Sequence, residues 1–576
     1  MKLKEISIKN FRGIRSLHLP LDDLTVLIGE NNTGKSSVLE AIQLVLTRGF
    51  GVRRGGQFTE YDFHLKDAIV TPQTAEPIVI TLHFAEEQEG EWSDAVVQQM
   101  SEVIQLDMKN GLNHIWLQAK GAFQMESASF ETKKTFLNSN GAELFLKNAT
   151  PLNLISRFVP LFFLSALRDV SREFGQHGQF WTGFLKSIQL PDEQREKIEE
   201  MLREVNTSVI SANAGLTEVT KKIADAGRLV PLDSADPVAL EAIPTRVFDM
   251  VGKVQVHLKS SCGAKLPLHR HGEGTQSLAV LMLFQAFAVA NLSEAYAPES
   301  EPILALEEPE AHLHPSAIRS LGPFLEAMSG QILVSSHSGD LISGVPLMAL
   351  RRLYKQNGDT KIGQVKSGIF TDRELQAIDY SIRLARGHYL FSRCWLLVEG
   401  ESDFHLMLLL FELMGHLQDQ VSFSVLEISQ IIDKGEPLIK LAKALGIQWF
   451  LMVDGDHAGN DYLNRANNHL ATDESLSDRA LALTHADIEH EFWHNGYDGF
   501  IQNMVSNTRK SQIEAEAADD EVNKRKLLIK AAIKQSGGKP SFAQALVNEI
   551  RQRGGVDSIP QTIRDIITRV VQLAGG

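Results

Sequence analysis

One stretch near the amino terminus constrains the fold most, because it predicts three linked elements in a row. Residues 24–28 are a short apolar run typical of a buried strand, and apolar residues recur at helical spacing over 37–46. Between them, residues 29–36 fit the pattern Gly-x4-Gly-Lys-Ser. In such a loop, backbone N–H groups and the positive end of the helix dipole converge on phosphate oxygens. The sequence therefore predicts an α/β domain that binds a nucleoside triphosphate, and the intact context disfavours a chance match.

The side chains of this loop have distinct expected roles. Lys35 can bridge phosphates, and the Ser36 hydroxyl can hold Mg²⁺. With ATP as the expected ligand, the predicted contacts within the loop are Gly29, Asn31, Asn32, Thr33, Gly34, Lys35, Ser36 and Ser37.

The length of the chain places this loop in a protein of several domains. At 576 residues the chain exceeds one core, so about two to four domains are expected. Its apolar content of 43% and charged content of 22% are typical of a globular protein. Two cysteines and short apolar runs favour a cytoplasmic protein without a disulfide framework or membrane span. The net charge of −15 disfavours nonspecific coating of nucleic acid, but it allows a local basic groove.

Two further buried strands predict the rest of the nucleotide site. One apolar run ends in Glu307 and Glu308, and a second ends in His337, with a helical segment between them. This order predicts a parallel sheet. Glu307 can hold Mg²⁺ through water, and Glu308 can polarise the attacking water. His337 could sense the γ-phosphate, although a lone strand-end histidine more often has a purely structural partner.

These elements resemble a known class of ATPase. Asn10-Phe11-Arg12, the phosphate loop and the strand ending in Glu307 are similar to the ABC-type heads of the structural-maintenance, recombination-mediator and OLD (overcoming lysogenization defect) proteins. Residues 272–277 resemble the OLD form of the signature motif. In that family the signature of one subunit closes over ATP held by another, so the resemblance implies a homodimer or larger assembly. It adds to the expected ATP site the residues Arg12, Gly272, Gly274 and Gln276.

A second set of acidic residues lies in the last third of the chain. Glu399 ends one predicted strand, and Asp403 follows about one helical turn later. Asp454 and Asp456 end another strand, and their i, i+2 spacing places both side chains on one side. Carboxylates at strand ends suit Mg²⁺, and two such ions could support phosphodiester hydrolysis. The alternative is a set of solvated strand-end acids.

The motifs Val398–Asp403 and Val453–Asp456 resemble the Toprim domain of topoisomerases, primases and OLD nucleases. An ABC head followed by a Toprim domain is the order found in OLD proteins, so the resemblance covers nearly the whole chain. It implies that Glu489 binds a second metal ion and that Lys539 offsets phosphate charge. The expected catalytic residues are Glu308, Glu399, Asp403, Asp454, Asp456 and Lys539. The expected ligands of Mg²⁺ or Mn²⁺, two ions in the Toprim site and one with ATP, are Ser36, Glu307, Glu399, Asp403, Asp454, Asp456 and Glu489.

One literal motif competes with this interpretation. His490–His494 fits H-E-x-x-H, the helical signature of zinc peptidases. However, Asn495-Gly496 should end the helix at once, and no pattern for a third ligand follows. The segment also lies where the nuclease hypothesis needs Glu489.

The expected fold class is α/β, an ABC-type ATPase head with a helical insert followed by a Toprim domain with a helical extension. Within the insert, apolar residues at 3/4 spacing from Ile198 to Val205 predict an amphipathic helix that could mediate dimerisation. The predicted regions are 1–165 (first ATPase lobe), 166–245 (insert), 246–371 (second lobe), 372–394 (helical connector) and 395–576 (Toprim domain with helical carboxyl-terminal part).

The leading hypothesis is an ATP-regulated, metal-dependent DNA endonuclease of the OLD type, in anti-phage defence or DNA repair. A first alternative is an ATP-switched DNA-binding clamp without nuclease activity. A topoisomerase-like enzyme would need a tyrosine nucleophile, and Tyr462 and Tyr497 lack supporting sequence context. The expected partners are DNA and a second copy of the chain. Because related proteins act alone, beside a helicase or with a retron, the resemblance also allows a partner encoded nearby.

Overall fold

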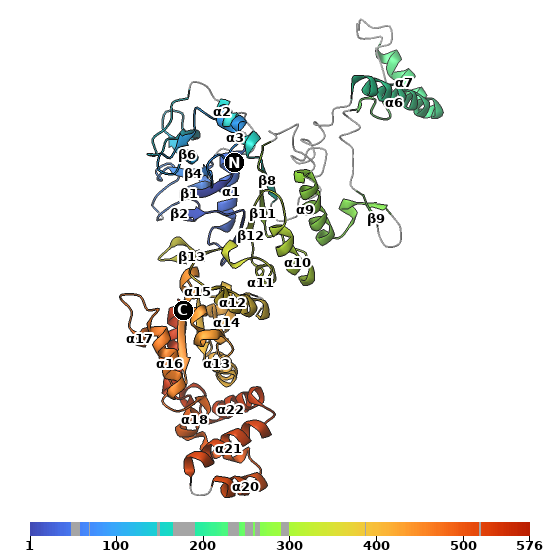
Figure 1. Cartoon of the computed structure of the whole chain (residues 1–576). Coiled ribbons are helices and arrows are strands. Elements are labelled where there is room, and N and C mark those ends of the chain that lie inside the picture. Colours follow the sequence, from blue (N-terminus) through green and yellow to red (C-terminus); the bar gives the residue numbers. More distant parts are fainter. Residues whose placement is uncertain are drawn as a thin grey trace.

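The computed structural model describes residues 1–47, 58–67, 69–146, 150–164, 191–227, 241–247, 257–259, 265–289, 299–385, 387–517 and 520–575. They form a head and a carboxyl-terminal half that follow one another along the long axis of the molecule (Figure 1). The predicted α/β class is confirmed. Within these ranges, no helix has the length and apolar character needed to cross a membrane.

The first sheet of the head is antiparallel. Its strand order is β2-β1-β4-β6-β5. The strand β7 pairs with the length of β6 that follows its short pairing with β5. Alternate residues of β1 and β4 are buried, as expected for strands with one face on a core. The short helices α2 (Asp94–Gln99) and α3 (Thr150–Phe158) lie beside this sheet. The strands are β1 (Leu3–Phe11), β2 (Ile14–Pro20), β4 (Ile78–Ala85), β5 (Gln105–Leu106), β6 (Asn113–Gln124) and β7 (Ser129–Leu137).

The second sheet of the head carries the phosphate loop. Its order is β14-β13-β3-β12-β11-β8, and every pair except β13–β14 is parallel, which confirms the predicted parallel arrangement. The carboxyl ends of the parallel strands therefore lie along one edge. The strands are β3 (Leu24–Ile28), β8 (Leu161–Leu164), β11 (Ile303–Glu307), β12 (Gln331–Ser335), β13 (Leu350–Gln356) and β14 (Asp359–Gln364), and the helices of this region are α1 (Lys35–Leu46), α9 (Glu273–Val289), α10 (Pro315–Glu326) and α11 (Gly339–Ile342).

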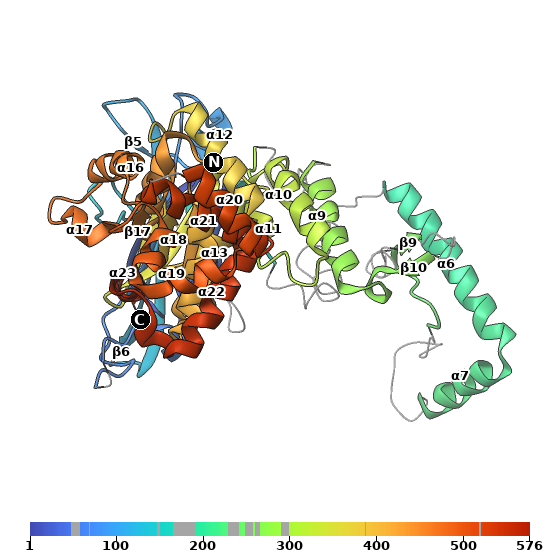
Figure 2. The ribbon, with the colours of Figure 1, turned by 90° about the horizontal axis from the view of Figure 1, so that it is seen from below.

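The helical insert stands apart from the head (Figure 2). Of the predicted insert, the structure describes α6 (Asp192–Ala212), α7 (Ala214–Gly227) and residues 241–245. The apolar stripe of α6 is largely exposed, with Met201 at 49%, Val205 at 50% and Val209 at 40% of their full exposure. After the insert, the described residues include the short antiparallel pair β9 (His257–Lys259) and β10 (Lys265–Pro267).

The carboxyl-terminal half is built on a parallel sheet of order β16-β15-β17-β18. Strands and helices alternate along this half: α13 lies between β15 and its neighbour β16, and α15 leads from β16 to β17 on the other side of β15. The strands are β15 (Cys394–Val398), β16 (Phe423–Glu427), β17 (Gln448–Val453) and β18 (Ala480–Ala482); the helices are α12 (Asp372–Leu384), α13 (Glu401–Leu413), α14 (Gln418–Val421), α15 (Glu436–Leu445), α16 (His457–Asn467), α17 (Leu476–Arg479), α18 (Ile488–Phe492), α19 (Asp498–Asn503), α20 (Asn507–Ala517), α21 (Glu521–Gln535), α22 (Lys539–Arg553) and α23 (Gln561–Leu573).

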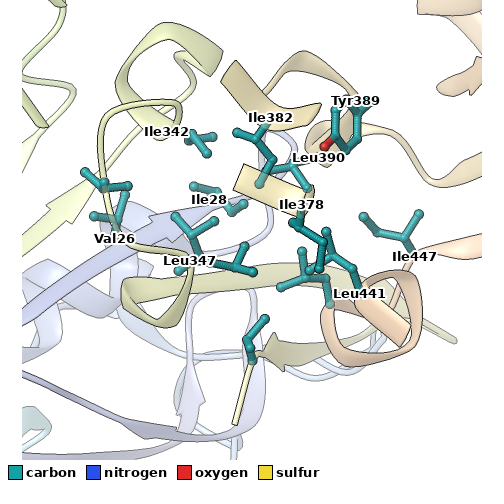
Figure 3. Packing of buried hydrophobic residues seen from close by; sticks show 14 of the residues in the cluster. Val26, Ile28, Ile342, Leu347, Ile378, Ile382, Tyr389, Leu390, Leu441 and Ile447 are labelled. Carbon is teal, nitrogen blue, oxygen red and sulfur yellow. The ribbon is translucent and has the colours of Figure 1, made fainter. Parts of the chain in front are cut away.

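One hydrophobic core joins the head to the carboxyl-terminal half (Figure 3). Val26 and Ile28 of β3 belong to the same cluster as Ile378 of α12, Leu441 of α15 and Ile447, which precedes β17. All five are nearly inaccessible to solvent. Since burying one aliphatic side chain contributes about 1.5–3 kcal/mol, this cluster fixes the two halves firmly against each other. The strand that leads into the phosphate loop is therefore packed on the second half.

Candidate functional site

The phosphate loop has a backbone that requires glycine. It leaves β3 at Gly29 with φ of 141° and enters α1 through Gly34 with φ of 103°, a region that L side chains rarely adopt. A Cβ at Gly29 would also lie 2.1 Å from the carbonyl oxygen of Leu353. The sequence pattern thus corresponds to a loop that must run close to the neighbouring strand β13.

Lys35 is the first residue of α1, and its ammonium group is held inside the loop. Its Nζ donates to the carbonyl oxygens of Gly29 and Glu30, each at 2.8 Å. Burial lowers the pKa of Lys35 to about 8, against the opposing effect of Glu308 and other carboxylates. Phosphate oxygens would be stronger partners for this ammonium than two carbonyl groups.

The other predicted loop residues surround this lysine. Thr33 is buried, and its hydroxyl donates to the Glu30 carbonyl at 2.8 Å, which stabilises the turn. The remaining side chains are open or half-buried at the loop and the first helical turn, where a triphosphate could reach them: Asn31, Asn32, Ser36 and Ser37.

The acids that end β11 lie beside the histidine that follows β12. His337 Nε2 is 3.6 Å from Glu308 Oε1, while Glu307 is the last residue of β11. Burial and the charge of Lys35 lower the pKa of His337, so these side chains and the lysine share one electrostatic environment. The parallel sheet thus brings the predicted triad of acids and histidine to the edge where α/β proteins bind their ligands.

Glu310 belongs to this region although the sequence analysis gave it no role. Its Oε1 accepts hydrogen bonds from the Ser336 hydroxyl at 2.6 Å and from the His337 backbone at 2.9 Å. Burial raises the pKa of Glu310. Its position, three residues beyond the end of β11, offered no pattern that would distinguish it from a loop acid.

Arg12 is held by the first lobe. It has a left-handed backbone with φ of 50°, and its guanidinium binds Asp62 at 2.9 Å and Glu40 at 2.7 Å. These two acids fix the arginine at the carboxyl end of β1, beside helix α1 that follows the phosphate loop.

The predicted signature segment lies at the start of α9. A Cβ at Gly274 would be 2.7 Å from the carbonyl oxygen of His312, and Gln276 Nε2 donates to the His271 carbonyl at 2.6 Å. Gly272 is exposed at the tip of this segment. Figure 1 shows α9 on the far side of β8 and β11 from α1, so one copy of the chain places its signature segment away from its own phosphate loop.

The acids of the second half converge at the carboxyl ends of β15 and β17. Glu399 follows β15, and its Oε2 accepts the backbone N–H of Asp454, which follows β17, at 3.3 Å. Asp403 is only 4% exposed and accepts the Gly400 backbone N–H at 2.8 Å. Asp456 caps α16 by accepting a backbone N–H at 2.9 Å. The carboxylates of Glu399, Asp403 and Asp456 are thereby oriented by the backbone.

The electrostatics of these acids indicate that a cation belongs among them. Burial, followed by repulsion from neighbouring carboxylates, raises the pKa of Asp403 to about 7 and of Asp454 to about 8. The pKa of Glu399 is raised for the same reasons, burial first. The Asp454 Oδ1 atom is buried and has no hydrogen-bond partner within the described structure. An all-oxygen donor set with uncompensated charge suits Mg²⁺ or Mn²⁺.

Among the residues that the structure describes, no three His, Cys, Asp or Glu side chains converge closely enough to form a metal site.

Glu489 and Lys539 flank the acids from the helical extension. Ser402 Oγ donates to Glu489 Oε1 at 2.6 Å. Burial and Asp487 raise the pKa of Glu489, while the charge of Lys539 acts in the opposite direction. Lys539 begins α22, which packs against α13, and its Nζ is 3.7 Å from Glu401 Oε2. The fold therefore brings both predicted residues to the edge of the acidic group.

Lys434 is a further cation at this site that the sequence analysis missed. Its Nζ lies 4.5 Å from the ring centre of Tyr462, and its charge lowers the pKa of Glu399. Burial and three carboxylates of the site, Glu399 first, raise the pKa of Tyr462 to about 12. Lys434 adopts φ of 57° in the loop between β16 and α15. Nothing in the sequence separates it from a surface lysine.

The H-E-x-x-H segment does not form a zinc site in the described structure. His490 Nδ1 is 2.7 Å from Asp487 Oδ1, whereas His494 Nε2 is 2.6 Å from Arg525 and its ring stacks on His485. Helix α18 continues into a π-helical turn at Trp493–Tyr497, and Asn495 and Gly496 break the helical backbone there, as predicted. The two histidines thus have separate partners, and the zinc-peptidase alternative finds no support.

Comparisons with known families agree with this division into two halves. Residues 1–388 match the family described as "Protein of unknown function (DUF2813)". Residues 390–456 match "Overcoming lysogenization defect protein-like, TOPRIM domain".

Individual relatives extend the similarity. "Uncharacterized protein YbjD" of Escherichia coli K12 is 26% identical over 590 residues, with 100% of both chains covered. "OLD nuclease" of Thermus scotoductus is 25% identical over 481 residues, covering 79% of this chain and 82% of that protein. Among solved structures, the carboxyl-terminal region of the Burkholderia pseudomallei OLD protein covers 32% of this chain and 99% of its own, with 22% identity and a TM-score of 0.25.

Proposed function

The chain belongs to the DUF2813 family and is homologous to OLD nucleases, with an OLD-like Toprim domain, and from this premise we propose that it is an ATP-regulated, divalent-metal-dependent DNA endonuclease. The observation that carries the proposal is the group of carboxylates Glu399, Asp403 and Asp454: Asp403 is buried, the other two are half-buried, the three repel one another, and an oxygen of Asp454 has no partner among the described residues. A purely structural site would pair such charges within the protein.

Each acid of the Toprim site has a role in this proposal. Glu399, Asp403, Asp454 and Asp456 would hold one ion, and Glu489 would contribute to a second. A bound Mg²⁺ or Mn²⁺ would supply the charge that activates water and stabilises the leaving oxygen of a phosphodiester.

The protein itself orients these groups before any ligand arrives. The backbone hydrogen bonds of Asp403 and Asp456 hold their carboxylates in place. Lys539, at the start of α22, would attract the scissile phosphate, and Lys434 presents a second positive charge from the opposite loop. The proposed site thus has cations on both sides of an acidic centre.

The head would act as the regulatory part. Lys35 and Ser36 would bind the triphosphate and its Mg²⁺, with Glu307 as a further metal contact. Glu308 would polarise water, and His337, which lies near both Glu308 and Lys35, would respond to the γ-phosphate. Since α9 faces away from α1, we propose that Gly272, Gly274 and Gln276 complete the ATP site of a second copy.

The exposed stripe of α6 supports an assembly of copies. Met201, Val205 and Val209 recur every four residues on one face of the helix, and covering them would remove apolar surface from water. In this proposal the insert mediates homodimerisation, and DNA is the substrate. The proposed setting is anti-phage defence or DNA repair.

A cleavage assay tests the proposal directly. The full-length chain is incubated with supercoiled plasmid and Mg²⁺ or Mn²⁺, and nicked and linear products are quantified. Asp454→Asn should abolish cleavage but retain ATP binding, while Asp473→Asn, the same change at an exposed loop acid, should leave cleavage intact. Metal-dependent binding of ATP and DNA without cleavage by the unmodified chain would instead favour an ATP-switched clamp.

A further inference from the structure

The phosphate loop is bonded directly to the Toprim half through one side chain. Glu30 follows Gly29 in the loop. Its two carboxylate oxygens accept hydrogen bonds from Nε and Nη2 of Arg393, each at 2.7 Å. The Ser422 hydroxyl adds a hydrogen bond to Glu30 Oε1 at 3.0 Å. Arg393 and Ser422 immediately precede β15 and β16, respectively. A residue of the nucleotide site thus contacts the starts of two Toprim strands.

The geometry of this contact, the Glu30–Arg393 pair, is better suited to transmitting a change of position than to stabilising the fold. A bidentate arginine–carboxylate pair fixes distance and orientation together. The side chains are 31% and 51% exposed, respectively, so water screens much of their attraction. A contact of this kind contributes little to the free energy of folding, but it makes the position of each side chain depend on the position of the other.

A single strand connects this pair to the acids of the Toprim site. Arg393 enters β15, whose five residues are all buried between β16 and β17, and Glu399 follows directly. At about 3.3 Å per residue, the strand spans roughly 17 Å. A buried central strand moves as a unit, so a displacement of Arg393 is transmitted to Glu399.

Arg352 makes a second connection at the same place. It pairs with Ile28, the residue before Gly29, in the register of β13 and β3. Its guanidinium is 2% exposed, and it donates to four backbone carbonyls that precede β15 and β17: those of Leu390, Ser392, Leu445 and Gly446. The amino-terminal ends of both acid-bearing strands are therefore fixed to the end of β3.

Nucleotide binding would act on the residue that holds Arg393. Lys35 now donates to the carbonyl of Glu30 itself, and a triphosphate would draw this ammonium away. A cavity of about 370 Å³ lies beside the pair and is lined in part by Glu30, Arg352 and Arg393, which leaves room for a rearrangement. The loop can thus change at Glu30 without disrupting the core.

We infer that the Glu30–Arg393 pair couples nucleotide occupancy of the head to the position of Glu399, with Arg393 as a positioning residue for the nuclease site. This inference rests on the proposed function and adds the route by which ATP controls it. The controlled change begins at Glu30 and Arg393 and reaches Glu399 along β15, while the hydrogen bonds of Arg352 hold the two halves together.

Hydrogen exchange of the full-length chain tests the coupling without requiring cleavage. Adding AMP-PNP and Mg²⁺ should change exchange at residues 399–406 and 454–460 of the unmodified chain. Arg393→Gln should remove this response while AMP-PNP affinity stays within about 2-fold, because the two sites are separate binding events linked by a coupling energy. Arg393→Lys, which keeps the charge but loses the bidentate geometry, should give an intermediate response.

Two controls separate coupling from general damage. Arg383→Gln breaks an exposed ion pair with Asp379 on α12 and should leave the exchange response unchanged. Glu30→Gln combined with Arg393→Gln should lose no more of the response than either single variant, as expected for residues that act as a pair. The inference is overturned if Arg393→Gln shows the same exchange response to AMP-PNP as the unmodified chain. It is also overturned if the unmodified chain shows no response.

Plasmid cleavage by the same samples distinguishes this inference from the proposed function. If the exchange response depends on the pair but no sample cuts DNA, the coupling stands and the nuclease assignment fails. If ATP alters cleavage equally in the unmodified chain and in Arg393→Gln, the nuclease assignment stands and the coupling fails.

Discussion

Glu399 and Asp454 end adjacent parallel strands, and the backbone N–H of Asp454 donates to the Glu399 carboxylate at 3.3 Å. The contact holds two acids together although burial and repulsion raise the pKa of both. The protein thus maintains an electrostatically unfavourable arrangement at the end of a buried sheet. Such an arrangement is expected where a cation completes the site.

The pH dependence of metal binding should follow these pKa values. Asp403 and Asp454, with pKa values of about 7 and about 8, are largely protonated in the metal-free fold at mildly acidic pH. Because their folded-state pKa values are raised, metal-free stability falls as pH rises from about 4 to about 8, and metal should restore it. Differential scanning fluorimetry should therefore show a larger Mn²⁺-induced rise in Tm near pH 8 than near pH 6. An equal rise at both pH values contradicts the assignment.

Asp454→Asn should separate the two halves functionally. The change keeps the shape of the side chain and removes its charge, so DNA cleavage should fall by more than about 100-fold, since even outer-shell partners of metal ligands are worth about 10- to 100-fold. Binding of a fluorescent ATP analogue should be unchanged. Retained cleavage with Mg²⁺ or Mn²⁺ would remove Asp454 from the proposed site.

Lys35→Ala should weaken ATP binding and keep DNA cleavage, the reverse of the result expected for Asp454→Asn. It removes the ammonium that bonds the loop carbonyls and would bind phosphates, so ATP affinity should fall by at least about 10-fold, the equivalent of one lost charge-assisted contact. Metal-dependent cleavage without ATP should persist. Isothermal titration and the plasmid assay measure the two effects on the same preparation, and undiminished ATP binding would place the nucleotide elsewhere.

Gly29→Ala should destabilise the head. The new Cβ would meet the Leu353 carbonyl at 2.1 Å in a backbone region that favours glycine, which is expected to cost more than about 2 kcal/mol. Gly358→Ala is a matched control, because Gly358 also has positive φ but open space around it, and should cost only about 1 kcal/mol. Urea unfolding of both variants gives the comparison. A similar loss of unfolding free energy in the two variants would mean that the loop relaxes away from β13.

Val205→Glu should weaken self-association. Val205 lies in the middle of the exposed stripe of α6, and a buried, unpaired carboxylate at an interface is strongly unfavourable. Thr207→Glu introduces the same group at an exposed position on the opposite face of the same helix and serves as the control. Light scattering over a concentration series should show dissociation of the first variant alone. If both variants match the unmodified chain, the stripe is not the dimer contact.

The features that could be predicted from the sequence are local ones. Gly29 to Ser36 and the acids at 399 and 454 each follow directly from a strand, so the spacing alone predicts their place at a sheet edge. The pairing of Glu30 with Arg393 could not be predicted in this way, because 363 residues separate them and only the packing of the two halves joins them. Lys434 was missed for the same reason, since its proximity to Glu399 depends on how one loop packs against α16.

The four hydrogen bonds of Arg352 have a consequence for how this joint can evolve. Every acceptor is a backbone carbonyl, so the arginine recognises the path of the chain and is indifferent to the side chains at positions 390, 392, 445 and 446. Other contacts constrain those side chains, since Leu390 and Leu445 are buried in the shared core and a Cβ at Gly446 would lie 2.3 Å from Tyr354. What Arg352 itself requires is the path of the two chain segments, so insertions or deletions in either segment would break its hydrogen bonds and leave a buried guanidinium without partners.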